Sequence, residues 1–106
     1  MKQSNPNITQ RIKSIVESYD PDAKVYLYGS RARRESKKNS DWDILILLSD
    51  DEITPEIERK VTSPIYDLEF ETGEIISPSV YSEKEWKSKF HVTPYYNNIM
   101  VEGKLL

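Results

Sequence analysis

Two short segments of the chain carry residues whose types and spacing suit phosphate and metal chemistry. In the first, Gly29 closes an expected strand and Ser30 opens an expected helical turn, so that backbone N–H groups and a hydroxyl can approach an anion. In the second, Asp41 and Asp43, here called the acid pair, stand two residues apart on an expected strand and project from one face. Two neighbouring carboxylates repel one another, and a bound Mg²⁺ relieves that repulsion.

A third carboxylate is expected from the next strand. Residues 65–71 alternate apolar and acidic side chains, which predicts a strand with Asp67, Glu69 and Glu71 on one face. One of these acids would complete a cage for two metal ions about 3.5–4 Å apart, the arrangement used for in-line phosphoryl transfer. We prefer Asp67, because it is an aspartate like the acid pair and comes earlier on the strand, and Glu69 is the alternative.

Hydrophobic periodicity and capping residues predict the elements that position this site. In chain order they are a helix to about residue 19 capped by Asn7 or Thr9, a strand over 24–28, a helical turn over 30–36, a strand over 41–48, a helix over 55–61, a hairpin with strands over 65–71 and 74–81, a helix from Ser82, and a helix from about Pro94 to Gly103. This order predicts an α/β (α+β) fold, a small mixed sheet with helices packed mainly on one face. We expect one domain over residues 1–106.

Composition excludes several classes of function. The net charge of -3 disfavours a nucleic-acid partner, because such binding normally needs a basic domain. The chain has no cysteine and one histidine, which excludes disulfides, thiolate metal sites and His-rich zinc sites. No apolar run approaches the roughly 20 residues of a membrane span, and the N-terminus has no apolar signal segment. We therefore expect a cytoplasmic protein that contacts no membrane.

The two chemical segments resemble the motif of the minimal nucleotidyltransferases, a branch of the DNA polymerase β-type superfamily. That motif reads Gly-Ser-x-Ala-x-Gly, a short spacer, and Ser-Asp-x-Asp. The matching stretches are Gly29-Ser30-Arg31-Ala32-Arg33 and Ser40-Asp41-Trp42-Asp43, with twelve residues from Gly29 to Asp41. Either half alone is common, but the two together at this spacing are specific. Arg34 stands where the pattern usually has its second glycine.

The resemblance implies a function for each matching residue. The implied nucleotide-binding residues are Gly29, Ser30, Arg33 and Ser40, and the implied catalytic, metal-binding residues are Asp41, Asp43 and Asp67. The implied reaction depends on two Mg²⁺ ions: a hydroxyl attacks the α-phosphate of a nucleoside triphosphate, ATP first among them, and pyrophosphate leaves. Asp67 would also help to deprotonate the acceptor hydroxyl.

Members of this branch often occur beside a small helical partner of the HEPN class, a toxin that they neutralise. The resemblance therefore implies an antitoxin that transfers AMP from ATP to a tyrosine of a HEPN-type toxin. The alternative is a non-catalytic antitoxin that uses the same fold as a docking platform. Arg34 and the choice of third acid leave this alternative open. Transfer to a small molecule ranks lower, because it needs an acceptor pocket that is usually built with a second domain.

Overall fold

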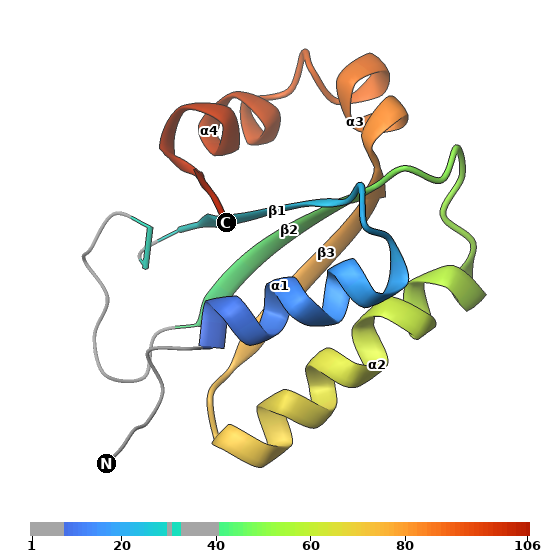
Figure 1. The fold of residues 1–106 in the computed structure, drawn as a ribbon. Coiled ribbons are helices and arrows are strands. Elements are labelled where there is room, and N and C mark those ends of the chain that lie inside the picture. The colour runs from blue at the N-terminus through green and yellow to red at the C-terminus, as the bar shows by residue number, and fades with distance from the viewer. Residues whose placement is uncertain (1–7, 30, 33–40) are drawn as a thin grey trace.

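A four-stranded sheet with helices on both faces forms the described part of the chain, residues 8–29, 31–32 and 41–106 of this computed structural model (Figure 1). The elements are α1 (Ile8–Tyr19), β1 (Lys24–Tyr28), β2 (Trp42–Leu48), α2 (Pro55–Thr72), β3 (Ile76–Ser82), α3 (Glu83–Lys89), α4 (Pro94–Glu102) and β4 (Lys104–Leu105). The predicted mixed α/β fold class is thus confirmed, but the helices cover both faces of the sheet and not mainly one, because β2 is apolar on both faces.

The order of strands in the sheet brings three strand ends together. The order is β3-β2-β1-β4, with β2 antiparallel to β1 and parallel to β3. The last residue of β1, Tyr28, pairs with Asp43 near the start of β2, and Asp43 pairs with Ser77 near the start of β3. The turn after β1 and the starts of β2 and β3 therefore meet at one end of the sheet.

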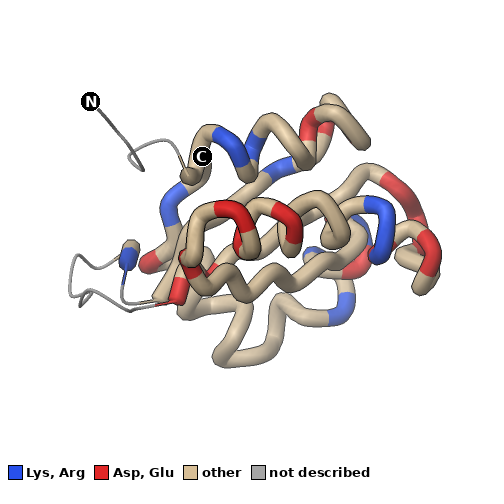
Figure 2. The backbone as a smooth tube through the Cα atoms, turned by 90° about the horizontal axis from the view of Figure 1, so that it is seen from below, with Lys and Arg blue, Asp and Glu red and all other residues tan. Residues whose placement is uncertain are grey.

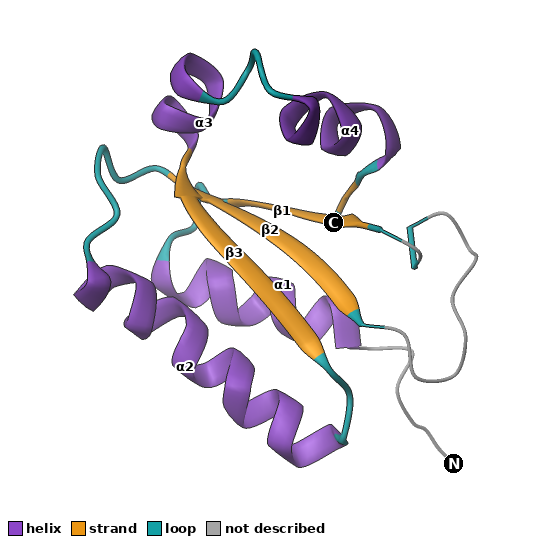
Figure 3. Cartoon of the chain, turned by 180° about the vertical axis from the view of Figure 1, so that it is seen from behind, coloured by secondary structure: helices purple, strands orange, loops and turns teal. Residues whose placement is uncertain are grey.

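Strand β2 is buried on both faces, as its apolar sequence predicts. Ile44, Ile46 and Leu48 pack in the larger core cluster, against α1 and α2. Leu45 and Leu47 pack in a second cluster, against the side chains of α3 and α4. Figure 3 shows the two long helices on one face of the sheet and the two short helices on the other.

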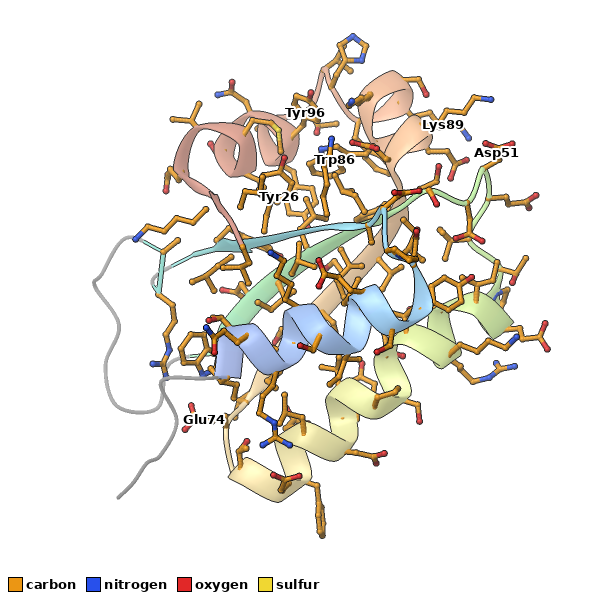
Figure 4. All side chains as sticks on the ribbon, viewed as in Figure 1. Tyr26, Asp51, Glu74, Trp86, Lys89 and Tyr96 are labelled. Atoms are coloured by element: carbon orange, nitrogen blue, oxygen red, sulfur yellow. The ribbon has the colours of Figure 1, made fainter. Side chains whose placement is uncertain are left out.

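Aromatic side chains fill the layer between the sheet and the short helices. The rings of Trp86 and Tyr96 lie 5.1 Å apart, and those of Trp86 and Tyr95 lie 5.5 Å apart with nearly perpendicular planes. Figure 4 shows Tyr26, Trp86 and Tyr96 within this layer. Ring contacts of this kind add to the free energy of area burial and fix the place of α4 over β1.

The hairpin predicted over residues 65–71 and 74–81 is wrong. Residues 65–71 continue α2, which ends at Gly73 with a left-handed backbone (φ 77°). Val61, Ile65 and Leu68 are buried at helical spacing, and Phe70 is 94% exposed. Tyr66, Leu68 and Phe70 also fitted the alternation of a strand. The helix is favoured because it buries Ile65 and Leu68 on the same face as Val61, one turn earlier in α2. Only the second predicted strand is present, as β3.

The helical turn predicted over 30–36 lies mostly outside the described residues, and the remaining elements are confirmed with changes at their ends. Of the two predicted caps of α1, Thr9 lies inside the helix and Asn7 lies outside the described residues. The Ser82 hydroxyl accepts from the N–H of Glu85, and the Thr93 hydroxyl accepts from the N–H of Tyr96, so both short helices begin at the predicted caps. The short strand β4 at the sheet edge was not predicted, because two residues carry no periodic signal. None of the helices in the described residues has the length and apolar character needed to span a bilayer.

Candidate functional site

Gly29 meets Asp43 at the end of the sheet where the three strands converge. Gly29 has φ 78°, a conformation that L side chains rarely adopt. A Cβ added at this position would overlap the carboxylate of Asp43. The backbone carbonyl of Gly29 accepts from the N–H of Ala32, which closes the turn at 3.1 Å. Glycine is therefore required here both for the turn and for the close approach of the first motif to the second.

The acid pair shares one face of the sheet with hydroxyls from β3. Asp43 and Ser77 are paired across the two parallel strands, so their side chains project to the same face. The Ser77 hydroxyl donates to Asp41 across 3.5 Å. Asp41 is exposed and Asp43 half-buried. The described residues thus bring together two carboxylates and a serine hydroxyl beside the glycine turn.

These side chains are too few to enclose a divalent cation by themselves. They suit a cation that binds together with a ligand, which supplies the remaining oxygen atoms. Within the described residues, no three His, Cys, Asp or Glu side chains lie close enough to hold a metal ion. Mg²⁺ is commonly held by one or two carboxylates, with phosphate oxygens and water filling the other positions. Asp41 and Asp43 can supply those two carboxylates, and a phosphorylated ligand would supply the remainder.

Asp67 and Glu69, the two candidates for the third carboxylate, are not brought to the acid pair. The strand that was to place them beside it is instead part of α2, where Asp67 is exposed. Glu69 accepts from the backbone N–H of Ile76 at 2.9 Å, which ties the end of α2 to the start of β3. Glu71 pairs with Arg11 at 2.7 Å, and this hydrogen bond lowers the pKa of the Glu71 carboxyl. The prediction that this segment lies on a strand next to the acid pair is therefore wrong.

A clamp of three side chains holds the first motif against the opposite face of β2. The guanidinium of Arg31 lies 4.1 Å from the ring centroid of Trp42, a distance suited to a cation–π contact. Trp42 Nε1 donates to Glu74 Oε1 at 2.7 Å, and Arg31 lies 3.6 Å from the same oxygen. Glu74 follows the end of α2 (Figure 4). Trp42 alternates with the acid pair along β2, so the clamp supports the site from the opposite face of the sheet.

Two tyrosine hydroxyls border the site on the side of α4. Tyr28 and Tyr95 lie 3.3 Å apart at their oxygens, and their rings meet edge to face. Burial raises the pKa of Tyr28 well above its usual range, and the Tyr95 hydroxyl adds to this effect. A tyrosine hydroxyl is protonated at neutral pH even without this shift, so Tyr28 can donate a hydrogen bond.

Ser30, Arg33 and Ser40, three predicted nucleotide-binding residues, lie outside the described residues, as does Arg34. Across the described chain, acidic and basic positions are interspersed (Figure 2). The geometry reported above therefore concerns Gly29 and the acid pair, with the side chains that surround them.

Comparison with known proteins decides the family. Residues 10–93 match the family described as polymerase beta, nucleotidyltransferase. The chain belongs to this nucleotidyltransferase family. The resemblance inferred from the two motifs is thereby confirmed. No curated protein matches the chain in sequence.

Two solved structures share this nucleotidyltransferase fold. One, of a mutant of the toxin-antitoxin MntA-HpeT, gives a TM-score of 0.60 at 17% identity, over 98% of this chain and 72% of the other. A second, of a toxin-antitoxin with AMP-PNP, gives a TM-score of 0.60 at 18% identity, over 93% of this chain and 71% of the other. At these identities the similarity is one of fold.

Sequence reasoning missed the side chains that the third strand of the nucleotidyltransferase domain brings to the acid pair. Ser77 was expected on the second arm of a hairpin and was given no role. Its spacing from Ser79 places both hydroxyls on one face of a strand. That spacing was visible in the sequence, but the parallel pairing with β2 was not. Glu74 was missed for the same reason, since its partners Arg31 and Trp42 are distant in the chain.

Proposed function

We propose that this chain is an antitoxin that transfers AMP from ATP to a hydroxyl of a protein partner. The observation that carries the proposal is the contact of Gly29 with Asp43, because it joins the two motifs of a nucleotidyltransferase at one point. Gly29 and Ser30 would bind the triphosphate, with Arg33 and Ser40 as further nucleotide-binding residues. Asp41 and Asp43 would bind the Mg²⁺ that accompanies the nucleotide.

The proposed reaction is an in-line displacement at the α-phosphorus. The acceptor oxygen forms a bond to that phosphorus, the bond to the bridging oxygen of the β-phosphate breaks, and pyrophosphate leaves. The proton of the acceptor hydroxyl leaves to solvent, because Asp41 and Asp43 are both assigned to Mg²⁺ binding. Bound Mg²⁺ would neutralise the charge that develops on the phosphate oxygens. Asp67 has no part in this proposal, because it lies on α2.

The partner that we propose is a small helical toxin of the HEPN type, and the acceptor is a tyrosine of that toxin. Support comes from two structures of similar fold, one of the toxin-antitoxin MntA-HpeT and one of a toxin-antitoxin with AMP-PNP. The second of these carries an analogue of ATP, which supports an adenine nucleotide as the substrate.

A non-catalytic antitoxin that binds the same partner is the second candidate. It is favoured by the sequence of β3, which has no acidic residue. On the face of the acid pair, β3 carries Ser77 and Ser79. With two carboxylates instead of three, nucleotide can bind while transfer is slow. The two candidates differ in whether the partner becomes covalently modified.

The test combines the full chain, α-labelled ATP, Mg²⁺ and the co-purified toxin. Label is expected on the toxin with the unchanged chain and to be lost with Asp43→Asn. Asp67→Asn is the matched control, because it makes the same chemical change on the exposed face of α2. Tight complex formation without label would favour the non-catalytic antitoxin. Full transfer by Asp43→Asn would remove the acid pair from the mechanism.

A further inference from the structure

A small cavity opens between α4 and the end of β1. Its volume is about 170 Å³. The residues that line it are Tyr28, Gly29, Tyr95, Asn98, Ile99 and Glu102. The last four recur at helical spacing, so that one face of α4 forms the wall opposite Tyr28 and Gly29. Neither the two motifs nor the family assignment gives these α4 residues a function.

The cavity lies next to the acid pair, because Gly29 borders both. Gly29 lines it and also lies against the carboxylate of Asp43. A ligand whose phosphates are held at Gly29 and the acid pair can therefore extend directly into this cavity. Sites that enclose whole drug-sized ligands measure about 300–1,000 Å³. The smaller volume here has room for one part of a nucleotide.

The lining chemistry identifies which part of a nucleotide the cavity accepts. The rings of Tyr28 and Tyr95 offer apolar surface to a flat ring. The Glu102 carboxylate, which also lines the cavity, can accept hydrogen bonds. Asn98 can both donate and accept, and the protonated hydroxyl of Tyr28 can donate to a ring nitrogen. A planar heterocycle with an amino group satisfies these groups.

We infer that this cavity binds the base of the nucleotide, and that Glu102 accepts a hydrogen bond from the exocyclic amino group of adenine. The inference rests on the proposed function, because it assumes that the phosphates lie at the acid pair. It assigns α4 the selection of the base, whereas the turn after β1 and the start of β2 hold the phosphates.

The experiment compares ATP with inosine triphosphate, which carries a carbonyl oxygen in place of the amino group. Binding of each nucleotide with Mg²⁺ is measured by calorimetry on the full chain. A carboxylate that accepts from the amino group is worth about tenfold in affinity, so the unchanged chain is expected to prefer ATP by that factor. In Glu102→Gln the side-chain amide can donate to the carbonyl of the inosine base, and the preference is expected to fall to about twofold or less.

Two further variants complete the test. Glu17→Gln makes the same change on α1, across the sheet, and is expected to keep the tenfold preference. Asn98→Ala is expected to weaken ATP binding several-fold, and circular dichroism shows that each variant is folded. An unaltered ATP preference in Glu102→Gln, or no preference in the unchanged chain, overturns the inference. Absence of any ATP binding by the unchanged chain overturns the proposed function as well.

Discussion

The two left-handed glycines of this chain provide a matched pair of substitutions that tests the geometry of the site. Gly29 has φ 78° and Gly73 has φ 77°, so alanine is strained at both positions. The surroundings differ, because a Cβ at Gly29 overlaps the Asp43 carboxylate and a Cβ at Gly73 has nothing within 4 Å. Gly73→Ala thus measures backbone strain alone, and Gly29→Ala measures strain together with displacement of Asp43.

The magnitudes follow from these two contributions. A left-handed conformation costs an L residue about 1 kcal/mol, which is the expected loss of unfolding free energy for Gly73→Ala. In Gly29→Ala the Asp43 side chain must also leave its rotamer, which adds roughly 0.5–1.5 kcal/mol. The expected total is about 2 kcal/mol. For a domain of this size, each 1 kcal/mol lowers Tm by about 4–8 °C.

The assay pairs urea denaturation with Mg²⁺-dependent ATP binding for each variant. Gly73→Ala is expected to lose stability and to bind ATP as the unchanged chain does. Gly29→Ala is expected to lose more stability and at least tenfold in ATP affinity, because the acid pair is displaced at the point where phosphate binds. Equal ATP affinity in the two variants would show that the contact between Gly29 and Asp43 does not position the site.

Three further predictions concern the fold and the clamp. Asp20 is buried, which by itself would raise its pKa, but hydrogen bonds from Ser49 and Asp22 outweigh this effect and lower it. The contribution of Asp20 to the free energy of unfolding is therefore complete above the pKa of about 3.9 in the unfolded chain, and it is lost as pH falls through the lower pKa of the folded state. In urea denaturation Asp20→Asn should be less stable by about 1–2 kcal/mol at pH 7, and the difference should shrink below about pH 4. Leu68→Ala should cost about 3 kcal/mol, whereas exposed Phe70→Ala should stay within about 0.5 kcal/mol in the same measurement; equal losses would contradict the helical course of α2. Glu74→Gln should weaken ATP binding about three- to tenfold in calorimetry with less than about 1 kcal/mol lost in stability, and unchanged binding would mean that the clamp does not support the first motif.

Local signals in the sequence were sufficient for most of the elements and for one half of the site. The caps at Ser82 and Thr93 act through side chains three residues away along the chain, so they could be read without any tertiary contact. The sequence predicted that the turn after the first strand and the acid pair lie together, and the antiparallel pairing of β1 with β2 is the structural reason that Gly29 meets Asp43. Family membership rested on these same residues and is confirmed.

The failure over residues 65–71 has a definite physical cause. In this seven-residue segment Tyr66, Leu68 and Phe70 fit the alternation of a strand, whereas Ile65 and Leu68 fit the spacing of a helix. What decides between them is burial against α1 and the sheet, which rewards the face that contains Ile65 and Leu68 and leaves Phe70 in solvent. The expected third carboxylate was assigned from this segment, so the error in secondary structure became an error in the site.

By itself, then, the sequence determined the glycine turn, the acid pair and the family, since each depends on residues close in the chain or on adjacent antiparallel strands. Only the tertiary structure decided what faces the acid pair. The parallel pairing of β3 with β2 places Ser77 there, and the packing of α4 on β1 places Asn98 and Glu102 beside Gly29. Both arrangements arise from contacts between segments far apart in sequence, whose energies depend on the whole core and are not encoded in any local pattern.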